Sequence, residues 1–128
     1  MKVKMVRRPL VSVVDDNDSV RESLKALIRS VGLAVEVFPS AEEFLHSDHL
    51  PDTQCLILDV RMPGIDGLEL RRQLLRNNRD IPTVFITAHG DTTARSQALE
   101  DGAVDYLFKP FSEQALLNAI NVALRGGM

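Results

Sequence analysis

The sequence predicts an α/β domain in which a five-stranded parallel sheet carries helices on both faces. Five short apolar runs alternate with five helix-like segments, an order that is typical of βαβ units. Several runs are almost continuously aliphatic or β-branched, as expected for strands that are buried on both faces. The predicted strands are Leu10 to Val14, Ala34 to Phe38, Cys55 to Leu58, Thr83 to Ile86 and Val104 to Phe108.

The segments between the runs carry start and stop signals of helices. In the first segment, apolar residues from Val20 to Val31 recur on one face, and the following Gly32 is a typical helix stop. Ser40 and Glu43 form a capping box at the start of the second segment. The residues that can cap the three later helices are Asp66, Asp91 and Ser112.

Two of the predicted helices have unusual compositions. The fourth is predicted to be the weakest, because Gly90, Thr92 and Thr93 open it and few large apolar residues follow. The third carries basic residues, which we interpret as a solvated helix face: Arg71, Arg72, Arg76 and Arg79.

The composition indicates one globular domain over residues 1–128, with its core between about residues 10 and 124. Hydrophobic residues make up 45% and charged residues 26% of the chain, a balance that argues against disorder. The net charge of −3 argues against direct binding of nucleic acid, which needs clustered positive charge.

The compartment is predicted from the lone cysteine and from the absence of long apolar segments. Cys55 cannot form an internal disulfide, and its apolar surroundings favour a small buried hydrophobe over a nucleophile. No run reaches the length of a signal-peptide core or a transmembrane helix. We therefore expect a cytoplasmic protein without a membrane partner.

Charged and polar residues collect where the predicted strands end. Asp15 and Asp16 follow the first strand, Asp59 the third, Thr87 the fourth and Lys109 the fifth. Because the strands are parallel, these ends share one edge of the sheet, where such folds bind their ligands. Each residue also has a simpler interpretation, such as a helix cap, a turn residue or a surface cation. Together, those interpretations require unrelated coincidences at one edge.

The chemistry of this set favours phosphoryl transfer. Three crowded carboxylates repel one another unless a cation lies between them, and Mg²⁺ prefers carboxylates, water and phosphate oxygens as ligands. The charges of Asp15, Asp16 and Asp59 would be balanced by Mg²⁺ and Lys109. A carboxylate can also act as the nucleophile and form an aspartyl phosphate. We expect Asp59 to be that acceptor.

The motifs "VVDDN", "LILDVRMPGIDGLEL", "FITAHGD" and "DYLFKPF" resemble the receiver (phospho-acceptor) domain of two-component response regulators. The resemblance covers the chain from Leu10 to about Leu124. It implies the flavodoxin-like (βα)5 fold with strand order 2-1-3-4-5. It also implies a phospho-acceptor switch that assists its own phosphorylation and dephosphorylation, rather than an enzyme with a separate substrate.

The resemblance assigns a role to each residue of the edge. Asp59 would accept the phosphoryl group. Asp16 and Asp59 would bind Mg²⁺ directly, Asp15 through water, and the main-chain carbonyl of Arg61 would add a ligand. Thr87 would hydrogen-bond to the phosphoryl group.

Three further roles follow from the same resemblance. Lys109 would pair with the phosphoryl group, and a cis peptide bond before Pro110 would direct this lysine. The ring of Tyr106, at the aromatic switch position, would turn inward as the hydroxyl of the fourth strand moves toward the phosphoryl group.

The resemblance further implies a sensor histidine kinase as phosphoryl donor and an output controlled by the fourth helix, fifth strand and fifth helix. Phosphorylation-linked homodimerisation through that face is a possible readout, and Phe108 is either a contact there or half-buried against Phe111. The pair "DVRMPG" and "AHGD" resembles receivers that often precede a helix-turn-helix output domain, which this chain would lack.

Three other hypotheses remain open from the sequence. Arg61 and His89 stand two residues after the acceptor and the threonine, and we hypothesise that they set the lifetime of the acyl phosphate. The alternative functions are an Mg²⁺-dependent aspartate-nucleophile phosphatase and a docking receiver that acts without phosphorylation. His46 and His49 are three residues apart, but a solvated helix end is favoured over a zinc site.

Overall fold

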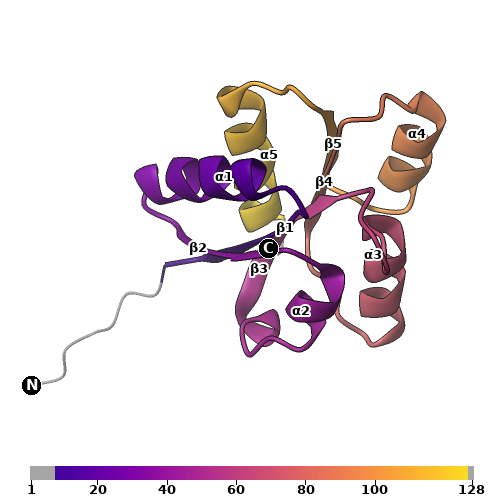
Figure 1. Cartoon of the computed structure of the whole chain (residues 1–128), viewed down its shortest axis with the longest axis horizontal. Helices are drawn as coiled ribbons and strands as arrows, with labels where there is room; N and C mark the ends of the chain where they lie inside the picture. Colours follow the sequence, from indigo (N-terminus) through magenta and orange to yellow (C-terminus); the bar gives the residue numbers. More distant parts are fainter. Residues whose placement is uncertain (1–7, 127–128) are drawn as a thin grey trace, which may run out of the picture.

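The computed structural model, which describes residues 8–126, contains one five-stranded parallel sheet (Figure 1). Its strand order is β2-β1-β3-β4-β5, so the predicted fold and strand order are confirmed. The predicted domain limits include residues 1–7 and 127–128, which lie outside the described part of the chain. The strands are β1 (Leu10–Val14), β2 (Ala34–Phe38), β3 (Thr53–Asp59), β4 (Thr83–Thr87) and β5 (Asp105–Phe108).

Five α-helices cover the two faces of the sheet (Figure 1). Buried side chains of α1 and α5 share one apolar cluster, and those of α2, α3 and α4 share the other. The helices are α1 (Asp18–Ser30), α2 (Ala41–Leu45), α3 (Gly67–Arg76), α4 (Thr92–Glu100) and α5 (Glu113–Arg125), with a short 3₁₀ helix η1 (Leu50–Asp52) before β3.

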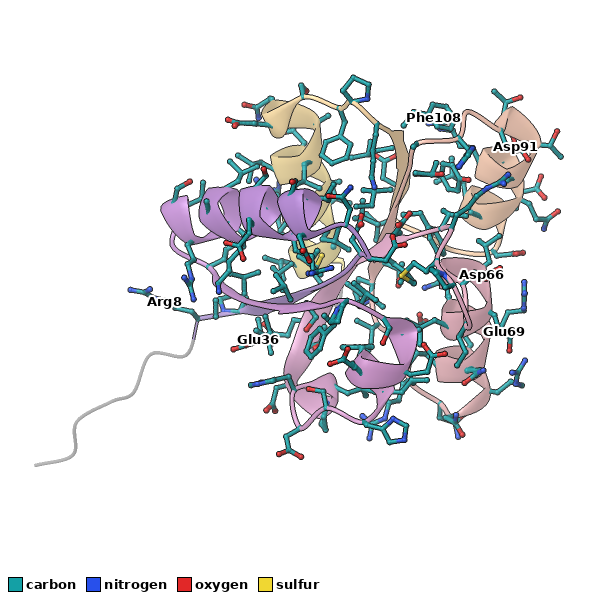
Figure 2. All side chains as sticks on the ribbon, viewed as in Figure 1. Arg8, Glu36, Asp66, Glu69, Asp91 and Phe108 are labelled. Carbon is teal, nitrogen blue, oxygen red and sulfur yellow. The ribbon has the colours of Figure 1, made fainter. Side chains whose placement is uncertain are left out.

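The four later helices begin at the predicted caps. The cap of α1 is Asn17, whose side chain accepts the amide hydrogen of Val20. The remaining cap side chains each accept an amide hydrogen from the first turn of α2, α3, α4 or α5, and they are Ser40, Asp66, Asp91 and Ser112. The caps Asp66 and Asp91 mark the starts of α3 and α4 in Figure 2. Gly32 follows α1 with a φ of +86°, which suits a helix stop.

The strand ends differ from the prediction in a way that matters for the site. The third strand extends from Thr53 to Asp59, longer than the predicted Cys55 to Leu58. The fourth includes Thr87. The polar residues at these strand ends continue the backbone hydrogen bonding of the sheet, because neighbouring strands supply partners for them. The pattern of apolar residues in the sequence does not reveal such partners. Asp59 and Thr87 are therefore held by the sheet itself.

The fourth helix is weakly packed, and the arginines of the third helix are not all solvated. Ala98 is the one buried residue of α4, which agrees with the prediction that this helix is the weakest. The interpretation of Arg71 as a solvated residue is wrong, since it is only 7% exposed. The side chain lies between α3 and the start of β4, where it donates to the hydroxyl of Thr83 at 3.0 Å.

Cys55 is fully buried, as expected, and burial raises the pKa of its thiol to about 12. His46 and His49 are exposed and contact Glu42 and Glu36 rather than a set of metal ligands. Within residues 8–126, no helix is both long and apolar enough to cross a membrane.

A glycine at the start of α3 permits the close approach of this helix to the end of β3. The amide of Gly67 donates to the carbonyl of Val60 at 3.0 Å. A Cβ atom at Gly67 would lie 2.2 Å from the carbonyl oxygen of Asp59, a distance that no relaxed side chain can keep. This glycine therefore fixes how closely the third helix approaches Asp59.

We expect Gly67→Ala to lower the free energy of unfolding by on the order of 2 kcal/mol, because the backbone of β3 or α3 must shift. Gly90→Ala is the matched control, since a Cβ there meets no atom within 4 Å. Urea denaturation of both variants measures the difference. Equal stability of the two variants would contradict the close-approach argument.

Candidate functional site

The three carboxylates predicted to meet at the edge of the sheet do so in the structure. β1 pairs with β3 so that Val14 lies level with Leu58. The residues that follow these two are both aspartates, Asp15 and Asp59. One carboxylate oxygen from each of Asp15, Asp16 and Asp59 lies within 4.8 Å of the others. In the described part of the chain, this is the one group of three or more potential metal ligands.

Asp15 is a fully buried charge with specific partners. Its Oδ2 accepts a hydrogen bond from the Nζ of Lys109 at 2.9 Å, and its Oδ1 accepts the amide hydrogen of Asn17 at 2.9 Å. Buried charges require such partners, because removal of either one leaves the other unpaired. The ion pair therefore connects the ends of β1 and β5.

Arg21 is a contact of the site that the sequence did not predict. It lies in α1, and its Nη1 donates to the main-chain carbonyl of Asp15 at 2.7 Å. The same guanidinium pairs with the carboxylate of Asp18. Its spacing of six residues from Asp15 places it near the start of α1, but spacing alone does not show the side-chain direction. Arg21 holds the backbone that carries the two adjacent aspartates.

Asp59 lies at the end of β3 and is 5% exposed. Its Oδ1 accepts the amide hydrogen of Arg61 at 3.3 Å. Burial, and then the negative charge of Asp15, raise its pKa from 3.8 to about 7, although Lys109 opposes this shift. The carboxylate is therefore destabilised by its surroundings.

This arrangement fits a hard divalent cation. The donor set consists of three carboxylates, of which Asp16 is exposed to solvent and can reach a hydrated ion. Positive charge between them would offset the repulsion that raises the proton affinity of Asp59. Mg²⁺ suits these oxygen donors and keeps coordination positions for water or phosphate.

The other two predicted residues, Thr87 and Lys109, border the same edge. Asp59 is level with Ile86 of β4, so Thr87 is the next residue along that strand. Its buried hydroxyl accepts the amide hydrogen of His89 at 3.1 Å. The amide of Lys109 donates to the carbonyl of Thr87 at 2.7 Å, and the peptide bond between Lys109 and Pro110 is cis.

Tyr106 of β5 is 2% exposed, so its ring already lies inside the molecule. The ring centroid is 5.9 Å from that of Phe85 and 5.7 Å from that of Phe108. Burial raises the pKa of its phenol. The negative charge of Asp91 raises this pKa further, whereas the positive charge of Arg61 lowers it. The inward ring position is therefore stabilised by aromatic neighbours within the apolar cluster on this face.

Phe108 is half-buried. The interpretation that its ring packs against Phe111 is wrong. It packs with Tyr106 on the face that bears α2, α3 and α4, whereas Phe111 belongs to the cluster on the opposite face. Figure 2 shows Phe108 beside β5, on the side of α4. Phe111 lies beyond the end of β5, after the cis bond between Lys109 and Pro110, and its ring joins the cluster of α1 and α5.

A cavity of about 410 Å³ lies next to the threonine and the tyrosine. Arg61 and His89, predicted to stand at the rim of the site, both line it. Asp91, the cap of α4, borders the same cavity. The cavity thus connects the acidic edge to the start of α4.

The loop between β3 and α3 is fixed by a residue from α2 that the sequence did not indicate. The carboxylate of Glu42 accepts the amide hydrogen of Ile65 at 3.2 Å. Gly64 beside it has a φ of +75°, and a Cβ there would lie 2.5 Å from the same carboxylate. Glu42 therefore positions the loop that follows Asp59, through a contact across 23 residues.

The raised pKa of Asp59 predicts how stability depends on pH in metal-free solution. Below pH 3.8 the side chain is protonated in both the folded and the unfolded state. Near pH 8 it is ionised in both states, and the buried negative charge destabilises only the folded state. We expect Asp59→Asn to raise the free energy of unfolding at pH 8 by on the order of 2 kcal/mol. The difference between the two proteins should diminish as the pH falls from about 7 to 4.

Thermal denaturation in a chelator measures this difference, with Asp66→Asn, at the half-buried cap of α3, as the control. An Asp59→Asn variant that is no more stable than the unmodified chain at pH 8 would contradict the predicted carboxylate repulsion.

Known proteins similar to this chain are response regulators. Residues 11–121 match the response regulator receiver domain family. The response regulator protein TodT of Pseudomonas putida is 45% identical over 119 residues, which are 93% of this chain and 52% of TodT. The transcriptional regulatory protein TdiR of Thauera aromatica is 44% identical over 114 residues, which are 89% of this chain and 50% of TdiR.

Solved structures agree with this match. The low-resolution structure of the response regulator StyR is 51% identical, has a TM-score of 0.83 and covers 92% of this chain and 60% of StyR. The chain spans about half the length of the curated relatives that it matches. From its fold, its acidic edge and these matches, the chain belongs to the receiver domain family of two-component response regulators.

Proposed function

We propose that Asp59 accepts a phosphoryl group from a phosphohistidine of a sensor histidine kinase. The observation that carries this proposal is the buried Asp59 carboxylate within 4.8 Å of two other carboxylates, one of which is paired with Lys109. Burial at the end of a strand fixes the position of the Asp59 carboxylate. The phosphoryl donor can then approach this carboxylate only from the open edge of the sheet.

The transfer needs one bond to form and one to break. A carboxylate oxygen of Asp59 attacks phosphorus and forms the P–O bond, while the P–N bond of the donor breaks and its electron pair returns to the imidazole. The ammonium of Lys109 and the hydroxyl of Thr87 stabilise the phosphoryl oxygens during transfer. Thr87 ends β4 and Lys109 directly follows β5, so neither side chain depends on a loop that must become ordered before the transfer.

Mg²⁺ would be held by Asp15, Asp16 and Asp59 with the main-chain carbonyl of Arg61. When bound, it supplies positive charge at the point where carboxylates and phosphoryl oxygens meet. The geometry that supports this set is the convergence of the three carboxylates. Asp15 keeps its hydrogen bond to Lys109, which suits a contact through water.

The phosphorylated state is read at the face made by α4, β5 and α5. We propose that Tyr106 is the switch residue, and its ring is buried against Phe85 and Phe108 in this structure. Thr87, drawn to the phosphoryl group, would hold this ring in its inward position. The weakly packed α4 responds to this change, since a helix with one buried residue shifts at low energetic cost.

The partners follow from the same scheme. The kinase is the phosphoryl donor. The greater length of the relatives supports an output domain in the whole protein. We propose that this output domain is a helix-turn-helix domain. Phosphorylation-linked homodimerisation through α4, β5 and α5 is the second possible readout. Half-buried Phe108 on this face supports a protein contact there.

We expect one labile phosphoryl adduct by intact-mass spectrometry after incubation with Mg²⁺ and acetyl phosphate. The adduct should be absent from Asp59→Asn and from samples with a chelator, because the acceptor or the charge balance is then missing. Asp66→Asn, which removes a carboxylate that caps α3, is the matched control and should accept the group.

The same experiment separates the rival functions. Rapid multiple turnover without an adduct would favour the aspartate-nucleophile phosphatase. Neither adduct nor turnover, also with a phosphohistidine donor, would favour a docking receiver and would contradict phosphorylation at Asp59.

Arg61 and His89 provide a second test, on the lifetime of the acyl phosphate. Both line the cavity from which water approaches, so Arg61→Ala with His89→Ala should open that approach. We expect the adduct to decay about fivefold faster, which corresponds to about 1 kcal/mol of barrier height. The decay is measured by intact mass after removal of the donor, with exposed Arg79→Ala as control. An unchanged decay rate would refute the role of both residues.

A further inference from the structure

The loop between β3 and α3 carries Arg61, whose main-chain carbonyl is one of the ligands that we propose for Mg²⁺. At the start of this loop, the amide of Val60 donates to the carbonyl of Ile86 at 3.0 Å, and the amide of Arg61 donates to Asp59. At its end, the amide of Gly67 donates to the carbonyl of Val60. The segment between these bonds takes its course from a different contact, which comes from α2.

The bend from Met62 to Ile65 has the residues of a type II turn, with proline in the second position and glycine in the third. Gly64 has a φ of +75°, as the third position of such a turn requires. In a closed turn, the amide of Ile65 would donate to the carbonyl of Met62. Here it donates to Oε2 of Glu42 at 3.2 Å. The side chain of Glu42 thus replaces the carbonyl that would otherwise close the turn.

Glu42 belongs to a short helix that the core holds in place. Ala41 and Phe44 of α2 are fully buried, and the ring centroid of Phe44 lies 5.3 Å from that of Phe38. The carboxylate lies directly against Gly64, where a Cβ atom would come within 2.5 Å of it. Because the helix is held by the core, the length of the Glu42 side chain sets where the bend lies.

We propose that Glu42 is a positioning residue for the Mg²⁺ site. Its hydrogen bond to the amide of Ile65 would hold the loop so that the carbonyl of Arg61 can serve as a ligand. Glu42 is not one of the three carboxylates that converge at the edge of the sheet, so it acts through the loop. The inference rests on the proposed function, because the loop matters to Mg²⁺ only if the acidic edge binds this cation.

A carboxylate could also attract the cation through its negative charge alone, and the two roles require different side chains. Glu42→Gln keeps an acceptor oxygen at the same reach but removes the charge. Glu42→Asp keeps the charge but is shorter by one methylene group, so the contact with Ile65 is lost. Exposed Glu43 lies in the same helix, and Glu43→Gln makes the same change in net charge as a control.

The test is a titration of the ¹⁵N-labelled chain with Mg²⁺ at constant ionic strength, followed by nuclear magnetic resonance. We expect the Kd for Mg²⁺ to rise about tenfold in Glu42→Asp, because residues that orient metal ligands affect metal affinity on this scale. Glu42→Gln should stay within about twofold of the unmodified chain, since its amide oxygen accepts the same hydrogen bond. Glu43→Gln should bind as the unmodified chain does.

A second measurement uses the metal-free chain. The amide hydrogen of Ile65 should exchange with solvent at least about tenfold faster in Glu42→Asp than in Glu42→Gln, because the donor then lacks a fixed partner. The amide of buried Ile57 in β3 serves as the reference. Faster exchange at Ile65 alone indicates a loosened loop, whereas faster exchange at both residues indicates a general loss of stability.

The outcomes separate this inference from the proposed function. A raised Kd in Glu42→Asp, with normal affinity in Glu42→Gln and faster exchange at Ile65 alone, would support the positioning role. Saturable binding with equal Kd in all variants would overturn the role of Glu42 and leave the proposed function intact. Affinity lost in Glu42→Gln would also overturn it, because the effect would then come from charge. No binding of Mg²⁺ by the unmodified chain would contradict the proposed function itself, and the role of Glu42 with it.

Discussion

The repulsion among three carboxylates at one edge of the sheet is the constraint on which the rest of the site depends. Parallel strands bring Asp15, Asp16 and Asp59 together, and burial of Asp15 and Asp59 limits the screening of their charges by water. Lys109 offsets part of this charge through Asp15, yet the pKa of Asp59 remains near 7. The fold thus keeps a carboxylate whose ionised form would be stabilised by added positive charge, and this is the property that a cation-dependent phosphoryl acceptor requires.

The surroundings of the carboxylates differ in rigidity from one side to the other. On the side of β1 and β3, the backbone is fixed by the guanidinium of Arg21, the close approach of Gly67 and the carboxylate of Glu42. On the side of β4 and β5, α4 has one buried residue and a cavity at its start. Under the function that we propose, a change of charge at Asp59 would be transmitted toward α4, because the opposite side is held by more contacts.

The sequence predicted the fold and the carboxylate cluster because both follow from local patterns. Apolar runs that alternate with helices give the parallel sheet, and the sheet brings strand ends such as Asp15 and Asp59 to one edge. The contacts of Arg21 and Glu42 depend on side-chain directions across 6 and 23 residues, which no local pattern encodes. Arg71 was misinterpreted because its charge suggested solvent, whereas the carbonyl groups between α3 and α4 bind it in the interior. The inward ring of Tyr106 likewise depends on aromatic partners from other parts of the chain.

The contacts at the two ends of α4 bear on the switch that we propose for this helix. Its cap Asp91 borders the cavity of the acidic edge, and the carbonyl of Asp101 after its last turn accepts from Arg71. Between these ends, Arg95 donates to the carbonyl of Tyr106 at 3.3 Å, and Ala98 supplies the one buried contact. With so little apolar burial, alternative positions of α4 differ by a small free energy, and a ligand shifts such an equilibrium only by its differential affinity. Because coupling between sites is reciprocal, any group that binds at one end of α4 and favours one position must also alter the equilibrium at the other end.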